Sequence, residues 1–95
     1  MKHYIIVKYD DTVTDKSLMA EKIRKLFVSG EDIPGIHSYS VIPNCVARDN
    51  RFDLMIEICM DRGALPLWDE SPLHRRWKNE FGGFIPAKTI FDRED

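Results

Sequence analysis

Four short stretches of the chain carry closely spaced apolar residues with the alternation typical of β-strands: residues 2–9, 36–42, 51–60 and 85–91. The first consists mostly of β-branched and aromatic residues, the types that suit a pleated surface. In residues 2–9 and 51–60, both faces of the predicted strand are largely apolar. We expect such strands to be covered on both sides, because exposed apolar patches mark interfaces.

Two other stretches repeat their apolar residues at the spacing of an α-helix. Thr14 is a suitable N-cap for a helix that extends to about Ser29. For the second helix, residues 72–81, Ser71 has the residue type of an N-cap and Pro72 that of a first helical position. The apolar side of this second helix is formed by Leu73, Trp77 and Phe81.

A proline separates the second helix from the strand before it. Pro66 falls within a region that Asp61 could cap, and a proline in a helix interior removes a backbone hydrogen bond. We therefore expect an irregular or short turn over residues 62–68 instead of one continuous helix from Asp61 to Phe81.

The predicted element order is strand, helix, strand, strand, helix, strand, which defines the ferredoxin-like α+β fold. It predicts one domain, residues 1–95, with a four-stranded antiparallel sheet and both helices on one face. The helices can cover only one side of this sheet, and Tyr4, Ile6 and Met55 lie on the other side. A homodimer packed through that second face is the expected solution.

Composition and charge narrow the classes of function. Fourteen Lys and Arg against sixteen Asp and Glu leave a formal net charge of −2, so no basic surface for nucleic acid is expected. No apolar run is long enough to span a membrane, and Met1 leads directly into a strand instead of a signal peptide, which favours a cytoplasmic protein. Cys45 and Cys59 match no zinc or thioredoxin spacing and no nucleotide motif is present, so we expect no metal and no cofactor.

Two histidines are the candidates for chemistry. His74 lies on the edge of the apolar stripe of the second helix, and His3 lies on the face of the first strand that the helices cover. Two imidazoles in one pocket between sheet and helices suit proton abstraction next to a carbonyl group. The pocket walls are predicted to include Phe27, Leu54, Trp68 and Trp77. The competing explanation is structural: hydrogen-bonded, partly buried histidines beside aromatic residues that only fill the core.

Four short motifs follow one another along nearly the whole chain: Lys2-His3-Tyr4-Ile5-Ile6-Val7-Lys8-Tyr9, Ile33-Pro34-Gly35-Ile36, Phe52-Asp53-Leu54 with Glu57, and Ser71-Pro72-Leu73-His74. In this order they resemble the stress-responsive A/B barrel (Dabb) family of dimeric α+β barrel proteins. The resemblance implies a homodimer in which the sheets of two chains close into a barrel.

The resemblance also implies roles for the two histidines. In a plant polyketide cyclase of this family, the histidine in the place of His74 is the general base of an aldol cyclisation, and the one in the place of His3 lines the same pocket. The tyrosine that works with that base falls on Trp68 here, and a further pocket histidine falls on Leu54. The same reaction on the same substrate is therefore not expected.

Two classes of function stay open from the sequence. In the first, the protein is a cofactor-independent lyase, cyclase or isomerase that uses His74 as general base on an apolar carbonyl compound. In the second, it is a non-catalytic dimeric protein that binds a small apolar ligand or is associated with stress. A monooxygenase of the same architecture is a third alternative. A cavity beside His74 that opens to solvent would favour the first class, and a filled core would favour the second.

Overall fold

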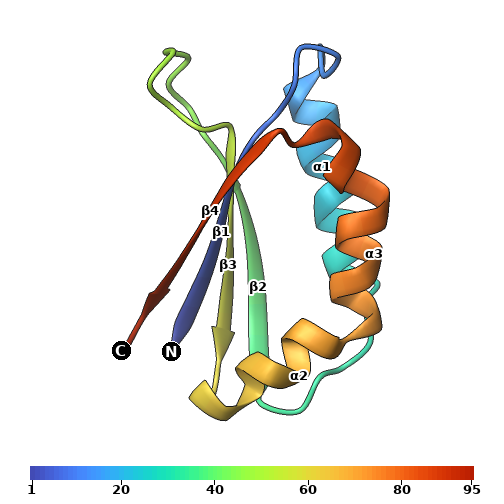
Figure 1. Cartoon of the computed structure of the whole chain (residues 1–95), viewed down its shortest axis with the longest axis vertical. Coiled ribbons are helices and arrows are strands. Elements are labelled where there is room, and N and C mark those ends of the chain that lie inside the picture. The colour runs from blue at the N-terminus through green and yellow to red at the C-terminus, as the bar shows by residue number, and fades with distance from the viewer.

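The computed structural model describes all 95 residues. Its elements are β1 (Lys2–Lys8), α1 (Lys16–Val28), β2 (Ile36–Pro43), β3 (Leu54–Met60), α2 (Leu65–Glu70), α3 (Pro72–Phe81) and β4 (Ala87–Arg93), with single 3₁₀ turns over Arg62–Ala64 and Gly82–Phe84. The strands form one sheet in the order β2-β3-β1-β4, and every neighbouring pair is antiparallel. Helices α1 and α3 lie on the same side of the sheet (Figure 1). The predicted ferredoxin-like α+β fold is therefore confirmed.

The apolar core lies between the sheet and the helices. Burial alternates strictly along β1 and β3, as expected for strands that bury one face completely. The buried positions of these two strands are His3, Ile5, Val7, Leu54, Ile56, Ile58 and Met60. The alternate positions, which include Tyr4, Ile6 and Met55, are half-buried on the side without helices. The sheet thus presents a second, largely apolar face, as the sequence predicted.

Several element boundaries differ from the sequence prediction. The N-cap of α1 is Asp15 and not Thr14, because the Asp15 carboxylate accepts a hydrogen bond from the Leu18 backbone N–H. Strand β3 begins at residue 54 instead of 51, and residues 51–53 form the end of the loop that precedes it. Strand β4 covers residues 87–93 instead of 85–91, since a 3₁₀ turn after α3 delays its start.

The expectation for Pro66 is correct in one respect and wrong in another. There is no continuous helix from Asp61 to Phe81, and α3 starts after Ser71 as predicted. However, residues 65–68 are helical, because Pro66 occupies the first turn of α2, where its missing N–H has no cost. The chain is interrupted at Ser71, whose backbone is extended (φ −70°, ψ 150°) between α2 and α3.

Two glycines allow close approaches that shape the layer of helices. Gly30 follows α1, and a Cβ at this position would lie 2.7 Å from Cδ2 of Leu73 on α3. Gly35 adopts a φ of +84°, which other residues rarely adopt, and a Cβ there would lie 2.9 Å from Cβ of Ala64. Gly30 thus allows α3, and Gly35 the 3₁₀ turn before α2, to lie close to the chain between α1 and β2.

None of the helices has the length and apolar character needed to cross a membrane.

Candidate functional site

A cavity of about 220 Å³ lies between β1, β4 and the α2–α3 segment. Its apolar walls are Ile5, Trp68, Trp77 and Ile90, and its polar side chains are His3, Asp69, His74, Lys78 and Lys88. Four of the six residues that the sequence predicted for the site, His3, Trp68, His74 and Trp77, border this one cavity. The wall that β4 contributes is exposed, since Ile90 keeps 46% of its surface accessible.

The other two predicted wall residues do not line the cavity. Phe27 lies behind the wall, where its ring packs against Trp68 and Trp77 at centroid distances of 6.0 and 5.7 Å. Leu54 is opposite Val7 in the sheet, whereas His3 is opposite Ile58, so Leu54 lies at the other end of β3. The sequence identified the correct sheet face for Leu54 but could not give its position along that face.

His74 is held by the junction between α2 and α3. The Ser71 hydroxyl oxygen accepts a hydrogen bond from the His74 backbone N–H at 3.0 Å, which caps α3 one turn before the imidazole. Nδ1 of His74 lies 2.9 Å from the carbonyl oxygen of Asp69. Because a carbonyl only accepts, Nδ1 is the protonated nitrogen, and Nε2 of the neutral ring carries the lone pair. The imidazole also packs on Trp68, with ring centroids 4.8 Å apart.

His3 is fixed by a carboxylate from the neighbouring strand. It is opposite Asp92 in the β1–β4 pair, and its Nδ1 lies 2.5 Å from Oδ1 of Asp92. The carboxylate accepts the Nδ1 proton, so Nε2 of this second imidazole is also an acceptor in the neutral ring. Only 5% of His3 is exposed. The cavity is therefore bordered by two histidines that are both held through Nδ1.

Asp92 is the main site residue that the sequence analysis missed. The predicted last strand, residues 85–91, stops one residue before it, whereas β4 extends to Arg93. The signal that could have revealed it is the antiparallel register, which places a residue near the end of β4 opposite one near the start of β1.

The charged groups that line the cavity are two lysines and the carboxylate of Asp69. Lys78 on α3 and Lys88 on β4 line it, and neither forms an ion pair or a side-chain hydrogen bond. The indole N–H of Trp68 also has no hydrogen-bond acceptor within the chain. The cavity thus combines two proton acceptors with donors and cations that can face a developing negative charge.

No group of three or more His, Cys, Asp or Glu side chains is placed to hold a metal ion.

No protein-family model matches the sequence, and no curated protein matches it either. Solved structures do match. A dimeric ferredoxin-like protein of unknown function from Thermobifida fusca superposes with a TM-score of 0.74 at 16% identity, over 95% of this chain and 85% of that chain. A protein from Arabidopsis thaliana gives a TM-score of 0.74 at 16% identity, over 99% and 93% of the two chains. A Dabb family protein with a ferredoxin-like fold from Mesorhizobium loti gives 0.71 at 9% identity, over 99% and 94%.

At these identities, the likeness concerns the fold. The chain has the architecture of the ferredoxin-like α+β proteins, as its own sheet order and helix placement require. Within that class, its fold is also that of a Dabb family protein, in agreement with the resemblance of the four sequence motifs.

Proposed function

We propose that this protein is a homodimeric, Dabb-type, cofactor-independent lyase, cyclase or isomerase that acts on an apolar carbonyl compound. His74 is the general base, and His3 is a second proton acceptor in the same cavity. The observation that carries the proposal is that both imidazoles border one cavity and both are engaged through Nδ1, by the Asp69 carbonyl and the Asp92 carboxylate. Each Nε2 is therefore an acceptor.

The proposed step is removal of a proton from the carbon next to the substrate carbonyl. The C–H bond breaks, the proton passes to Nε2 of His74, and the electron pair moves towards the carbonyl oxygen to give an enolate. The ammonium groups of Lys78 and Lys88, or the Trp68 N–H, would stabilise the charge on that oxygen. The enolate carbon can then form a bond, lose a group or be protonated again, which covers cyclase, lyase and isomerase chemistry.

The walls of the cavity support an apolar substrate. Trp68 and Trp77 are 1% and 3% exposed and are backed by Phe27, so the aromatic side of the cavity is rigid. Ile5 and Ile90 form the opposite, sheet side. The volume of about 220 Å³ in the isolated chain is below the usual range for small-molecule sites, roughly 300–1,000 Å³, so the substrate must be small.

The homodimer is part of the same proposal. A structural neighbour from Thermobifida fusca is described as a dimeric protein, and the present chain leaves one sheet face without helices. On that face Ile42 and Phe91 are 42% and 58% exposed, and they accompany the predicted interface residues Tyr4, Ile6 and Met55. A second copy of this chain would cover such a face.

The test uses benzoylacetone, a small apolar β-diketone, in deuterated buffer, with loss of the α-proton signal followed by NMR. The protein should accelerate exchange above the buffer rate. His74→Ala should reduce the accelerated rate by roughly 10²- to 10⁴-fold, and His3→Ala should reduce it less. His37→Ala is the matched control, because this exposed histidine pairs with Asp61 away from the cavity.

The outcomes separate the two classes of function. Loss of exchange in His74→Ala, with an unchanged circular dichroism spectrum, supports the catalytic proposal. Binding of benzoylacetone without faster exchange would favour a non-catalytic binding protein instead. Equal exchange in the parent protein and in His74→Ala would remove His74 from the role of base.

A further inference from the structure

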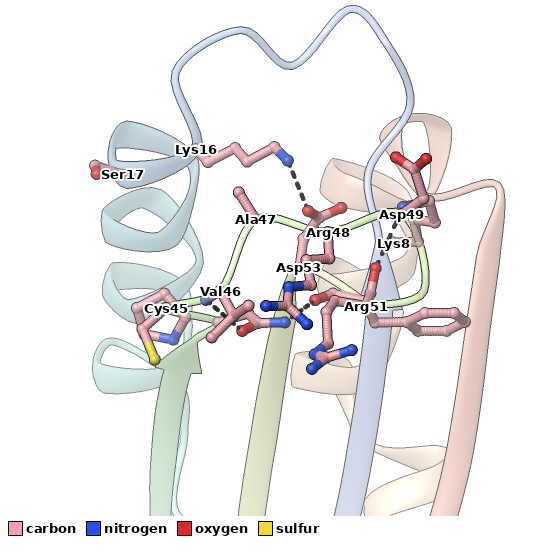
Figure 2. A pocket seen from close by; sticks show the side chains of 13 residues that line it. Lys8, Lys16, Ser17, Cys45, Val46, Ala47, Arg48, Asp49, Arg51 and Asp53 are labelled. Carbon is pink, nitrogen blue, oxygen red and sulfur yellow. Dashed lines mark hydrogen bonds and ion pairs between the residues drawn. The ribbon is translucent and has the colours of Figure 1, made fainter.

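A second cavity lies at the opposite end of the sheet and is larger, with a volume of about 400 Å³. It is bordered by the loop of residues 44–53, by the end of β1 and by the first turn of α1. Figure 2 shows the loop arching over this cavity and Lys16 reaching across from α1 to Asp53. None of its lining residues borders the cavity of His3 and His74.

The loop that closes this cavity has ten residues, whereas hairpin connections usually have two to five. It is held at its base by two hydrogen bonds: the Asn44 backbone N–H donates to the Asp53 carbonyl at 2.9 Å, and the Asn44 side chain donates to the Phe52 carbonyl at 2.7 Å. A turn near its tip is closed by the Arg51 N–H on the Arg48 carbonyl at 3.1 Å. These hydrogen bonds hold the loop at its base and near its tip, and the cavity beside it is open, since most of its lining residues are exposed.

Cations predominate around the cavity. Lys8, Lys16, Arg48 and Arg51 line it against only Asp49 and Asp53, which leaves an excess of two positive charges in a chain of net charge −2. One carboxylate is already engaged: Asp53 accepts hydrogen bonds at 2.8 Å from both the Lys16 ammonium and the Tyr9 backbone N–H. Burial alone would raise the pKa of the Asp53 carboxyl, but these bonds and the charges of Lys16 and Lys8 hold it below its usual value.

The two arginines have almost no partners within the chain. The guanidinium of Arg48 forms no hydrogen bond and no ion pair, and that of Arg51 contacts only the side-chain oxygen of the adjacent Asn50. Lys8 donates to the Arg51 carbonyl at 3.3 Å, which keeps its ammonium group beside the cavity. Guanidinium groups bind carboxylate and phosphate oxygens in pairs of parallel hydrogen bonds. Their unused donors point to an anionic ligand.

We infer that this cavity binds a small organic dianion, a phosphate monoester with an apolar substituent. Arg48, Arg51 and Lys8 would hold the phosphate, and the excess of two positive charges matches the charge of a phosphate monoester above its second pKa of about 6. The apolar part has a surface to contact, because Pro43, Val46, Ala47 and Phe52 also line the cavity. The volume is within the usual range for small-molecule sites.

The test follows backbone amide signals by NMR during titration with phenyl phosphate at about pH 7.5, where the phosphate is a dianion. Saturable shifts are expected at residues 44–53 and at Lys8 and Lys16. The double variant Arg48→Ala/Arg51→Ala should weaken the affinity by about tenfold or more, since it removes both paired donors. The matched control is Arg75→Ala/Arg76→Ala, which removes two arginines of α3 that do not line this cavity.

Two further measurements decide the result. Phenol, which lacks the phosphate, should cause no saturable shifts at the same residues. Vesicles of phosphatidylcholine with phosphatidic acid serve to distinguish a lipid headgroup from a soluble ligand. Binding to these vesicles without binding of phenyl phosphate would overturn the inference of a soluble ligand. Absence of saturable shifts, or equal weakening in both double variants, would overturn the site itself.

Discussion

Nδ1 of His3 lies 2.5 Å from a carboxylate oxygen of Asp92, across the antiparallel pair of β1 and β4. The two residues are direct neighbours in the register, so their side chains emerge on the same face of the sheet. That face borders the cavity of His74. The contact joins a residue near the start of the chain to one near its end, and it determines which nitrogen of His3 can accept a proton.

Replacement of Asp92 by alanine should change the tautomer of His3. Without the carboxylate, Nδ1 has no acceptor, and the Nε2–H form that imidazole prefers in water should become populated. The measurement is a long-range ¹H–¹⁵N spectrum of the histidine rings in the parent and in Asp92→Ala. His74 is the internal control, because its Nδ1 is held by the Asp69 carbonyl. An unchanged His3 tautomer would show that the carboxylate does not control it.

Introduction of a charge on the helix-free sheet face should dissociate the proposed dimer. Met55→Glu would place a carboxylate opposite Ile6 in the centre of that face, and an unpaired charge is costly to bury. Light scattering should give the mass of two chains for the parent and of one chain for the variant. Val28→Glu is the control, because Val28 is 81% exposed at the end of α1. A parent protein with the mass of one chain would contradict the dimer.

Tyr9→Phe should stabilise the protein, in contrast to the usual effect of losing a hydroxyl. The Tyr9 hydroxyl is buried without a hydrogen-bond partner, so its removal relieves a desolvation cost of about 1 kcal/mol. Urea unfolding at neutral pH should therefore give a higher free energy of unfolding for the variant. A lower value would indicate that the hydroxyl has a partner in solution.

The same substitution should change the dependence of stability on alkaline pH. Burial, together with the nearby charge of Asp53, raises the pKa of Tyr9 to about 12. An unfolded chain ionises this tyrosine from about pH 10. Between these two values the unfolded state loses the proton and the folded state keeps it, so the parent loses stability as the pH rises. The stability difference between Tyr9→Phe and the parent should therefore increase above about pH 10.

Ser71→Ala should destabilise the helix that carries His74. The Ser71 hydroxyl accepts from the His74 N–H and donates to the Trp68 carbonyl at 2.8 Å, so it satisfies groups at the ends of two helices. Loss of such a cap lowers the free energy of unfolding by about 1 to 2 kcal/mol. Ser17→Ala is a suitable control, because Ser17 is exposed on α1 and makes no side-chain hydrogen bond. Equal effects of both substitutions in urea unfolding would contradict the capping role.

The sequence was sufficient for the fold because the pattern of burial has a clear period. Residues 3, 5 and 7 of β1 and residues 54, 56 and 58 of β3 are buried as the alternation predicts. The spacing of Leu73, Trp77 and Phe81 likewise gave the buried side of α3 correctly. The position of Pro66 was misjudged because a proline at the start of a helix and one in its interior have the same local sequence signal.

Less of the site could be predicted from the sequence, because the site depends on the register between neighbouring strands. Periodicity gives the face of a strand but not its neighbour, so Leu54 was assigned to the cavity and Asp92 was not. The cationic cavity under residues 44–53 was missed for a related reason. Its four cations come from β1, α1 and the loop, and only the folded chain brings them together.

All seven residues of β4 are exposed, and this strand pairs only with β1. In the isolated chain β4 should therefore open locally more readily than the central strands, and its amides should exchange with solvent before those of β1 and β3. When β4 detaches, it takes with it Lys88, Ile90 and Asp92, while His74 and both tryptophans stay on the core. Detachment of β4 would therefore open this wall of the cavity and release the His3 imidazole from its carboxylate in the same event.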